Sequence, residues 1–308
     1  MQQDKPIINP YAAIFIAVLS VSTSAIFVKV SSAPASIIAT YRLLFAVLFM
    51  SPWLLVNYRS QLKRIRKKDF WYCTLAGVFL AFHFILWFES LNYTSVASSV
   101  VLVTLQPLFA FIGTYLFFKE KLSFGAITGG ILAIIGSFVI SWGDFQVSGM
   151  ALIGDVLALL ACAMVTGYLL FGQNVRKRLD LIPYTFLVYG MAVATLVIYD
   201  LIIQVPLVGY PAKDWTIFVL LALFPTLLGH SIFNWVVKWI SVSVISMSIL
   251  GEPIGASILA YFILGEKIHA SQMAGGFVIL SGIFIFLRFH RHQSKKARVN
   301  QGKTVQQH

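Results

Sequence analysis

The sequence predicts an all-α integral membrane protein whose ten transmembrane helices form two inverted five-helix repeats. Three observations predict this fold: an apolar composition, ten long apolar runs, and a repeat between the two halves of the chain. Of the 308 residues, 59% are hydrophobic and only 11% are charged, and the mean hydropathy is +0.85. Soluble domains carry charge on about a quarter of their residues, so the composition excludes a soluble globular fold.

The apolar residues form continuous runs rather than one-sided stripes. A helix of roughly 20 apolar residues crosses the hydrocarbon core of a bilayer, whereas strands of a membrane barrel are about 10 residues long and alternate in polarity. The first run lacks the basic start of a signal peptide and is too long for one, so we expect it to remain as a helix. In chain order the ten runs are Tyr11–Val30, Ile37–Val56, Phe70–Leu91, Val96–Phe118, Phe124–Trp142, Met150–Phe171, Pro183–Val205, Trp215–Val236, Val242–Leu264 and Ala270–Phe289.

The lysines and arginines that produce the net charge of +12 are predicted to lie mainly on one side of the membrane. Ten spans place both termini on one side, and that side holds every lysine and arginine except Lys29, Lys213, Lys267 and Arg42. Cytoplasmic loops carry the Lys and Arg excess, so both termini are predicted to be cytoplasmic in a cell (inner or plasma) membrane. The basic residues are expected to contact membrane lipids, and no nucleic-acid partner is predicted. Residues 291–308 are predicted to be a basic, disordered cytoplasmic tail.

The two halves match without gaps at an offset of 146 residues, which carries Ser95 onto Ser241. The predicted units are residues 11–143 and 149–290. Because each unit has an odd number of spans, the second must enter the membrane in the opposite orientation, as in many secondary transporters. The identities fall on proline, glycine and charged positions, which shared hydrophobicity alone would not align; they include Pro107/Pro253, Tyr115/Tyr261, Glu120/Glu266, Lys121/Lys267, Gly129/Gly275, Gly130/Gly276 and Gly136/Gly282.

Short motifs recur in order along the whole chain. The first half contains Pro34, Tyr41-Arg42-Leu43, Gln106-Pro107 and Lys119-Glu120-Lys121, and the second contains Gly154-Asp155, Gly229-His230, Asn234-Trp235, Gly251-Glu252-Pro253 and Leu264-Gly265-Glu266-Lys267. On these residues the chain resembles the EamA family of the drug/metabolite transporter superfamily over roughly residues 11–290. Lys119 stands where that family usually has glycine. The resemblance implies ten helices in two repeats and export of amino acids or similar metabolites without ATP. Neither enzyme activity nor a cofactor is expected.

Glu252 is the first candidate for the transport chemistry. It lies near the middle of the ninth run and directly precedes Pro253, and an ionisable group at the bilayer centre is costly enough to be functional by default. Proline interrupts helix hydrogen bonding, so Pro107 and Pro253 are predicted helix kinks, with Gln106 as the neutral counterpart of Glu252. We expect Glu252 to bind substrate or a proton; the alternative is a carboxylate that satisfies backbone donors near the kink.

Two further pairs of polar residues share helix faces. His230 and Asn234 are four residues apart, as are His83 and Trp87, and residues at this spacing lie on one face. His230 and Asn234 are predicted either to contact substrate or to bridge neighbouring helices. For His83 and Trp87, packing is the favoured interpretation and lining of a substrate cavity is the alternative.

Arg42 and Glu89 fall at comparable depth in the external halves of their spans. An ion pair between them is predicted, with a structural role favoured over that of an external gate. The glycines of the fifth and tenth runs are expected to let helices approach closely, either each other or those of a second protomer, so a monomer and a homodimer both remain open. Cys73 and Cys162 are expected to be buried thiols, and no metal site is predicted.

Together these features predict a secondary transporter, an exporter of amino acids or related small metabolites, working by alternating access and driven by protons or exchange. A drug or toxic-compound efflux pump of the same fold is the first alternative. An integral membrane enzyme acting on lipid head groups is a remote one, because such enzymes cluster acids, often with a metal, at one membrane face, whereas the 11 acids here are scattered.

Overall fold

The computed structural model describes residues 6–94, 96–141, 149–265 and 270–305, with only the course of the backbone for 291–305. Within these ranges every regular element is a helix. The elements are α1 (Pro10–Val21), α2 (Ser24–Val30), α3 (Ala35–Asn57), α4 (Arg59–Lys63), α5 (Lys67–Tyr93), α6 (Val96–Val103), α7 (Gln106–Phe118), α8 (Phe124–Ser141), α9 (Gly149–Val175), α10 (Leu181–Ile202), α11 (Ala212–Leu221), the π-helical segment η1 (Ala222–His230), α12 (Ser231–Val236), α13 (Val242–Ile249), α14 (Glu252–Leu264) and α15 (Ala270–Val305).

These helices account for the ten predicted spans. In the described ranges, nine helices or joined helices are long and apolar enough to cross a membrane, and α8 is a shorter apolar helix. The prediction of an all-α membrane fold is therefore confirmed. Large apolar side chains also remain on the outside of the bundle: Phe262 is 76% exposed and Phe277 is 74% exposed. An outer surface of this kind is suited to contact with lipid tails.

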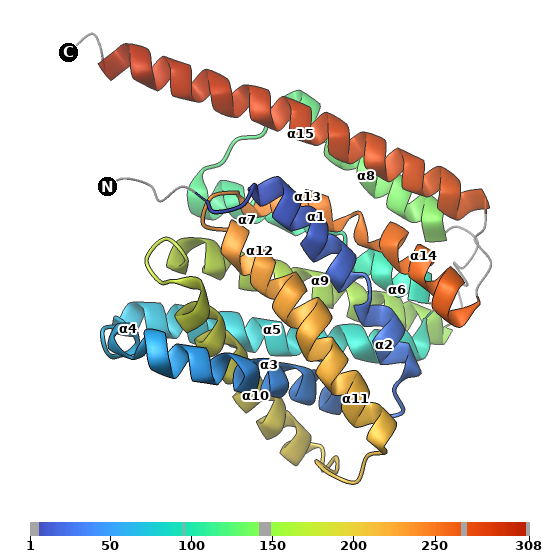
Figure 1. The fold of residues 1–308 in the computed structure, drawn as a ribbon. Helices are drawn as coiled ribbons and strands as arrows, with labels where there is room; N and C mark the ends of the chain where they lie inside the picture. Colours follow the sequence, from blue (N-terminus) through green and yellow to red (C-terminus); the bar gives the residue numbers. More distant parts are fainter. Residues whose placement is uncertain (1–5, 95, 142–148, 266–269, 306–308) are drawn as a thin grey trace.

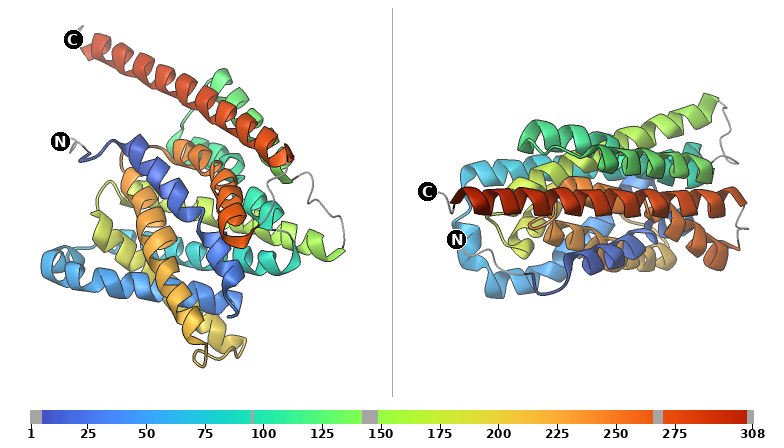
Figure 2. Two further views of the ribbon diagram at one scale, coloured as in Figure 1. Left: turned by 45° about the vertical axis from the view of Figure 1, so that its right-hand side comes forward. Right: turned by 90° about the horizontal axis from the view of Figure 1, so that it is seen from above.

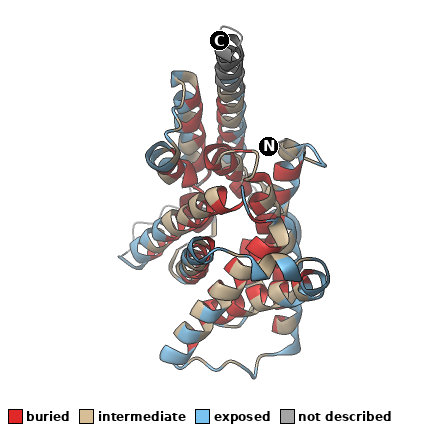
Figure 3. Ribbon diagram, turned by 90° about the vertical axis from the view of Figure 1, so that its left-hand side faces the viewer, coloured by how far each residue is buried: buried red, intermediate tan, exposed pale blue. Residues whose placement is uncertain are grey.

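The helices pack around a shared interior (Figure 1). α5 packs along α9 and α10, α10 along α3, and α1 crosses η1, while α7 meets α13. Buried residues face inward between these helices, and exposed residues lie on their outer sides and at their ends (Figure 3). Small residues allow the closest approaches, since a Cβ added at Gly77 of α5 would lie 2.6 Å from the carbonyl oxygen of Val188 in α10.

Three spans are interrupted near the middle of the bundle. α1 passes into α2 at Ser22–Thr23, α6 into α7 at Thr104–Leu105, and α13 into α14 at Leu250–Gly251. Pro107 and Pro253 each lie in the first turn of the second segment, where the missing proline N–H would have had no helical partner. The predicted kinks are thus breaks between two segments. The break at Ser22–Thr23 was not predicted, and four nearby serines and threonines were its only signal in the sequence.

The segments α7 and α14 end in the same way. Lys119 has φ +56° and caps α7, and Gly265, its counterpart at the 146-residue offset, has φ +69° and caps α14. This left-handed conformation is disfavoured for residues with a Cβ. The turn geometry is therefore the same in both halves, although lysine replaces glycine in the first.

Helices α8 and α15 form a closely packed pair along one side of the molecule (Figures 1 and 2). A Cβ added at Gly129 would lie 2.7 Å from the carbonyl oxygen of Gly282, and one added at Gly136 would lie 2.8 Å from that of Gly275. The helices are therefore antiparallel, and the glycines that the repeat equates, Gly129 with Gly275 and Gly136 with Gly282, meet crosswise. The glycine-rich faces pack on each other.

The prediction that the basic tail is disordered is wrong for most of the tail's length. α15 continues through residue 290 to Val305, because the segment is rich in helix-forming Gln, Lys, Arg and Ala and the preceding span supplies the helix nucleus. Several sequence-based expectations lie outside the described residues: Ser95, Glu266, Lys267, the end of the first unit at residue 143, and residues 306–308.

Candidate functional site

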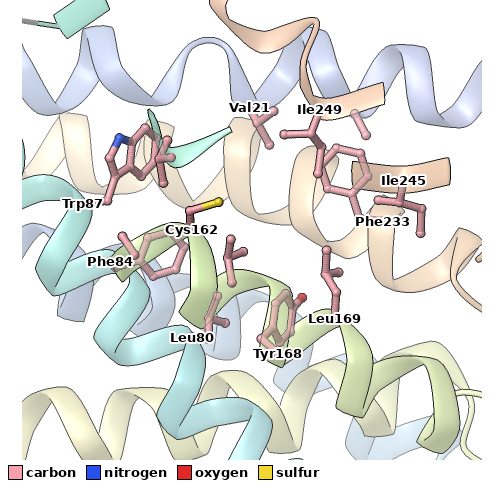
Figure 4. Packing of buried hydrophobic residues seen from close by; sticks show 14 of the residues in the cluster. Val21, Leu80, Phe84, Trp87, Cys162, Tyr168, Leu169, Phe233, Ile245 and Ile249 are labelled. Carbon is pink, nitrogen blue, oxygen red and sulfur yellow. The ribbon is translucent and has the colours of Figure 1, made fainter. Parts of the chain in front are cut away.

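A small, partly enclosed cavity lies where the interrupted spans meet. Its volume is about 20 Å³, enough for about one water molecule. Part of its wall is apolar and includes Val21, Leu169, Phe233 and Ile249 (Figure 4). Five of the six predicted binding residues also line it: Glu252, Gln106, His83, Trp87 and His230. Residues from helices far apart in the sequence are therefore brought to one space.

Glu252 is the first residue of α14 and is 6% exposed. Its carboxylate forms no hydrogen bond with any side chain or backbone group in the described part of the chain. The backbone carbonyl of Glu252 instead accepts a 3.3 Å bond from the Ser22 hydroxyl, so the break in the first span packs against the break in the ninth. Gly255, one turn further along α14, leaves room for the Ser22 side chain. The carboxylate is buried, faces the cavity and sits at a helix N-terminus, where the helix dipole favours negative charge.

Gln106 occupies the matching position as the first residue of α7 and is 4% exposed. Its Oε1 is buried and has no hydrogen-bond partner in the structure. Two segment N-termini therefore present an amide and a carboxylate to the same cavity, as the repeat predicts. Interrupted helices that point their N-termini at a central site are a recurring feature of transporter binding sites.

His83 and Trp87 lie one turn apart on α5 with their rings stacked, centroids 5.7 Å apart. The Nδ1 atom of His83 is 3.0 Å from the Ala161 carbonyl oxygen. A carbonyl only accepts, so Nδ1 carries a proton and Nε2 is left available as an acceptor. Trp87 Nε1 is a buried donor without a partner. The structure thus places in the cavity wall two residues for which packing was the favoured interpretation.

His230 and Asn234 belong to two successive helical segments, η1 and α12. η1 ends at His230, where the backbone N–H of Ser231 bonds to the carbonyl of Thr226, five residues earlier, and π-helical turns are frequent at functional sites. His230 lies in the cavity wall, with its ring centroid 6.3 Å from that of His83. Asn234 instead accepts a 2.6 Å bond from the Tyr168 hydroxyl. Of the two predicted roles, helix bridging fits Asn234 and cavity lining fits His230.

The predicted ion pair between Arg42 and Glu89 is not formed. Arg42 is completely buried, and its Nε and Nη1 donate to Thr226 Oγ1 at 3.0 Å and Ser24 Oγ at 3.1 Å. Glu89 is half-buried and accepts a bond from Asn92. Similar depth placed the two residues together in the prediction, but Arg42 points into the bundle, where its charge acts on Glu252, His83 and His230.

Two residues escaped the sequence analysis, one in the cavity wall and one behind it. Ser24 lines the cavity and is 1% exposed, yet a serine in an apolar run gives no signal by itself. Thr226 became informative only through the π-helical segment, for which Pro225 was the one local indication. The described residues contain no group of three or more His, Cys, Asp or Glu side chains that would hold a metal ion. The cavity therefore offers hydrogen bonding and charge rather than a metal centre within the described ranges.

Comparisons with known proteins agree with this architecture. The EamA-like transporter family matches residues 9–142 and again residues 152–288. An uncharacterized transporter of Bacillus subtilis (strain 168), YxxF, is 24% identical over 294 residues, covering 91% of this chain and 89% of its own. An uncharacterized transporter of Archaeoglobus fulgidus is 24% identical over 260 residues, covering 79% and 91%. A protein of known crystal structure superposes with a TM-score of 0.75 at 17% identity, over 92% of this chain and 98% of that one, and shares the fold.

Proposed function

Because this chain belongs to the EamA-like transporter family, we propose that it is a secondary transporter that exports amino acids or related small metabolites in exchange for protons. It is a multi-pass membrane protein, and we place it in the cell membrane with both termini in the cytoplasm, because the Lys and Arg residues gather on that side. The observation that carries the proposal is that Glu252 and Gln106, the first residues of α14 and α7, line the same cavity.

Alternating access accounts for the small size of that cavity. About 20 Å³ holds no amino acid, so the binding site has to open before a solute enters. The contact of α7 with α13 is one place where the two halves separate or close: Thr114 Oγ1 lies 2.9 Å from Ser243 Oγ, and the Ser241 hydroxyl donates to Glu120 Oε1 at 3.0 Å. These bonds hold the predicted cytoplasmic ends of the two helices together in the conformation described.

Proton exchange follows from the chemistry of Glu252. Its carboxylate is buried without a hydrogen-bond donor, it shares the cavity wall with His83 of α5 and His230 of η1, and the charge of Arg42 on α3 acts on it. A buried carboxylate that no donor or ion-pair partner compensates favours the uptake of a cation. A proton and the ammonium group of a solute then compete for the same carboxylate. Binding one releases the other, and an inward proton gradient drives the solute outward.

The polar groups in the wall favour metabolites over hydrophobic drugs. A carboxylate, an amide, two imidazoles and an indole N–H converge on the cavity, and the buried groups of Gln106 and Trp87 have no partner in the protein. A site built from buried polar groups discriminates strongly against ligands that leave those groups unpaired. Drug efflux on the same fold is the alternative, because seven of the twelve residues that line the cavity are apolar or aromatic.

The test is a transport assay with purified protein in liposomes. A panel of labelled L-amino acids is offered with and without an imposed pH gradient and without ATP, and an internal pH dye records proton movement. We expect at least one solute to move against its gradient, with proton flow in the opposite direction. Absence of solute movement under every gradient, from protein shown to be folded, would contradict the proposal.

A further inference from the structure

Arg42 carries a charge that the protein leaves largely uncompensated. It is 0% exposed, lies in the middle of the bundle on α3, and has no carboxylate within ion-pair distance among the described residues. Two hydroxyls accept from Nε and Nη1, and the ring of Phe84 lies 4.2 Å below the guanidinium carbon. Nη2 is buried with no hydrogen-bond partner. Hydroxyls and an aromatic face solvate the charge only in part.

Burial of such a group is expensive. Guanidinium does not lose its proton in proteins, and a charged arginine at the centre of a membrane segment is costly on every insertion scale. Removing one partner of a buried charge is destabilising because the remaining charge is unpaired. A buried cation with an unused donor therefore indicates a negatively charged ligand that binds and dissociates.

The position of Arg42 relative to the cavity suits this role. Its Nη1 donates to Ser24 Oγ, and Ser24 belongs to the cavity wall. The guanidinium is thus one hydrogen bond behind the wall, and its charge acts on Glu252, His83 and His230, which line the same space. A movement that widens the cavity at Ser24 exposes Nη1 and Nη2 together. Two parallel N–H groups of arginine match the two oxygens of a carboxylate.

We propose that Arg42 binds the carboxylate of the transported solute while Glu252 binds its ammonium group, so that the site selects zwitterions. This inference rests on the proposed transport function and assigns its specificity. Glu252 supplies the anion in the cavity wall, and Arg42 supplies the cation one hydrogen bond behind the wall, at Ser24. A solute with only one of the two groups leaves the other protein charge buried and unpaired, which lowers its affinity.

A purely structural role for Arg42 predicts different behaviour. In that case the residue only ties α3 to α2 and η1, and its loss weakens the fold without changing which solutes bind. Arg176 supplies the matched control. It is also buried, at 3% exposed, and it donates to the carbonyls of Asn234 and Leu179 away from the cavity. Burial lowers the pKa of Arg176 only to about 10, so Arg176 is charged at neutral pH, as any guanidinium in a protein is.

The experiment compares each common L-amino acid with its carboxamide and its decarboxylated amine. Binding to purified protein is measured by thermal stabilisation, and inhibition of transport is measured in liposomes. For the wild type we expect the acid of the best-bound amino acid to be favoured over its amide by about 10- to 100-fold. R42Q should reduce this ratio to near unity, whereas R176Q should lower stability and keep the ratio. R42K, which retains the charge without the paired donors, should give an intermediate ratio even if R42Q does not fold.

Two results would overturn the assignment to Arg42. One is wild-type protein that binds an amide or amine as tightly as the matching acid. The other is R42Q or R42K protein that keeps the full preference for the acid. Neither result decides whether the wild type transports solutes, because the liposome assay tests this separately by recording movement of any solute in the panel.

Discussion

The Nε atom of Arg42 donates a 3.0 Å hydrogen bond to Thr226 Oγ1, and this bond ties α3 to the π-helical segment η1. Thr226 Oγ1 in turn donates to the carbonyl of Leu221 at 2.7 Å. The hydroxyl therefore serves both the wide helical turn that ends at His230 and the buried guanidinium. Residues outside the cavity wall thus set the position of two groups proposed to take part in binding.

Replacing Thr226 with valine tests this link. T226V keeps the shape of the side chain but leaves Nε of a buried cation without its acceptor, and we expect a loss of about 1–3 kcal/mol in stability. Thermal unfolding in detergent measures it. T226S, which keeps the hydroxyl, should lie closer to the wild type, and T216V, on the exposed face of α11, should be nearly neutral. Equal stability of T226V and T226S would show that the bond contributes nothing.

Glu252→Gln tests the exchange mechanism. The amide keeps the size of the side chain and binds neither a proton nor an ammonium group as a charge. We expect solute transport driven by a pH gradient to fall at least about tenfold, which corresponds to roughly 1.4 kcal/mol, and the remaining transport to become independent of pH. Glu89→Gln, at a half-buried position away from the cavity, is the control. Transport by E252Q with its pH dependence intact would remove the proton from the mechanism at this residue.

Gly282→Ala tests the contact of α8 with α15. A Cβ at this position would lie 2.5 Å from the backbone nitrogen of Ala133, so the two helices have to move apart. Overpacking of this kind costs about 1–3 kcal/mol. Gly190→Ala on α10 meets no atom within 4 Å and should be neutral or slightly stabilising, since alanine is the better helix former. Equal melting temperatures for the two variants would argue against close packing of α8 and α15.

Asn234→Ala separates helix bridging from ligand contact. The change removes the acceptor of the fully buried Tyr168 hydroxyl, whose bond to Asn234 is 2.6 Å long. We expect stability to fall by about 1–3 kcal/mol and solute affinity to stay within about twofold of the wild type. His230→Ala should do the reverse, with a larger effect on affinity than on stability. Binding titrations and thermal unfolding on both variants decide between the roles.

Glu120 gives a pH dependence outside the spans. Burial raises the pKa of its carboxyl above the model-compound value of 4.5, and the bonds from Ser241 and Ser243 oppose that change. The folded state therefore favours the protonated form. The contribution of Glu120 to stability is fully present below pH 4.5 and is lost as the pH rises through the raised folded value. Glu120→Gln keeps an acceptor for Ser241, and its unfolding curves should change less with pH across this interval; an unchanged profile would contradict the assignment.

Composition, periodicity and the internal repeat were sufficient for the architecture. Long apolar runs reveal spans because a bilayer leaves the backbone no hydrogen-bonding partner except its own helix. The paired prolines located the interrupted segments, and the rarity of buried charge marked Glu252 and, through the repeat, Gln106 as candidates. These signals depend on neighbouring residues along the chain, so they can be recognised in the sequence alone.

The partners of those residues were decided by the tertiary structure. Depth along a span says nothing about rotation around its helix axis, so Arg42 was paired with Glu89 although its side chain points toward Ser24 and Thr226. Helical spacing put His230 and Asn234 on one face, but only packing shows that His230 lies in the cavity wall while Asn234 bonds to the buried Tyr168 hydroxyl. A cavity forms only when several helices meet, and therefore only packing could show that His83 and Trp87 share a wall with Glu252.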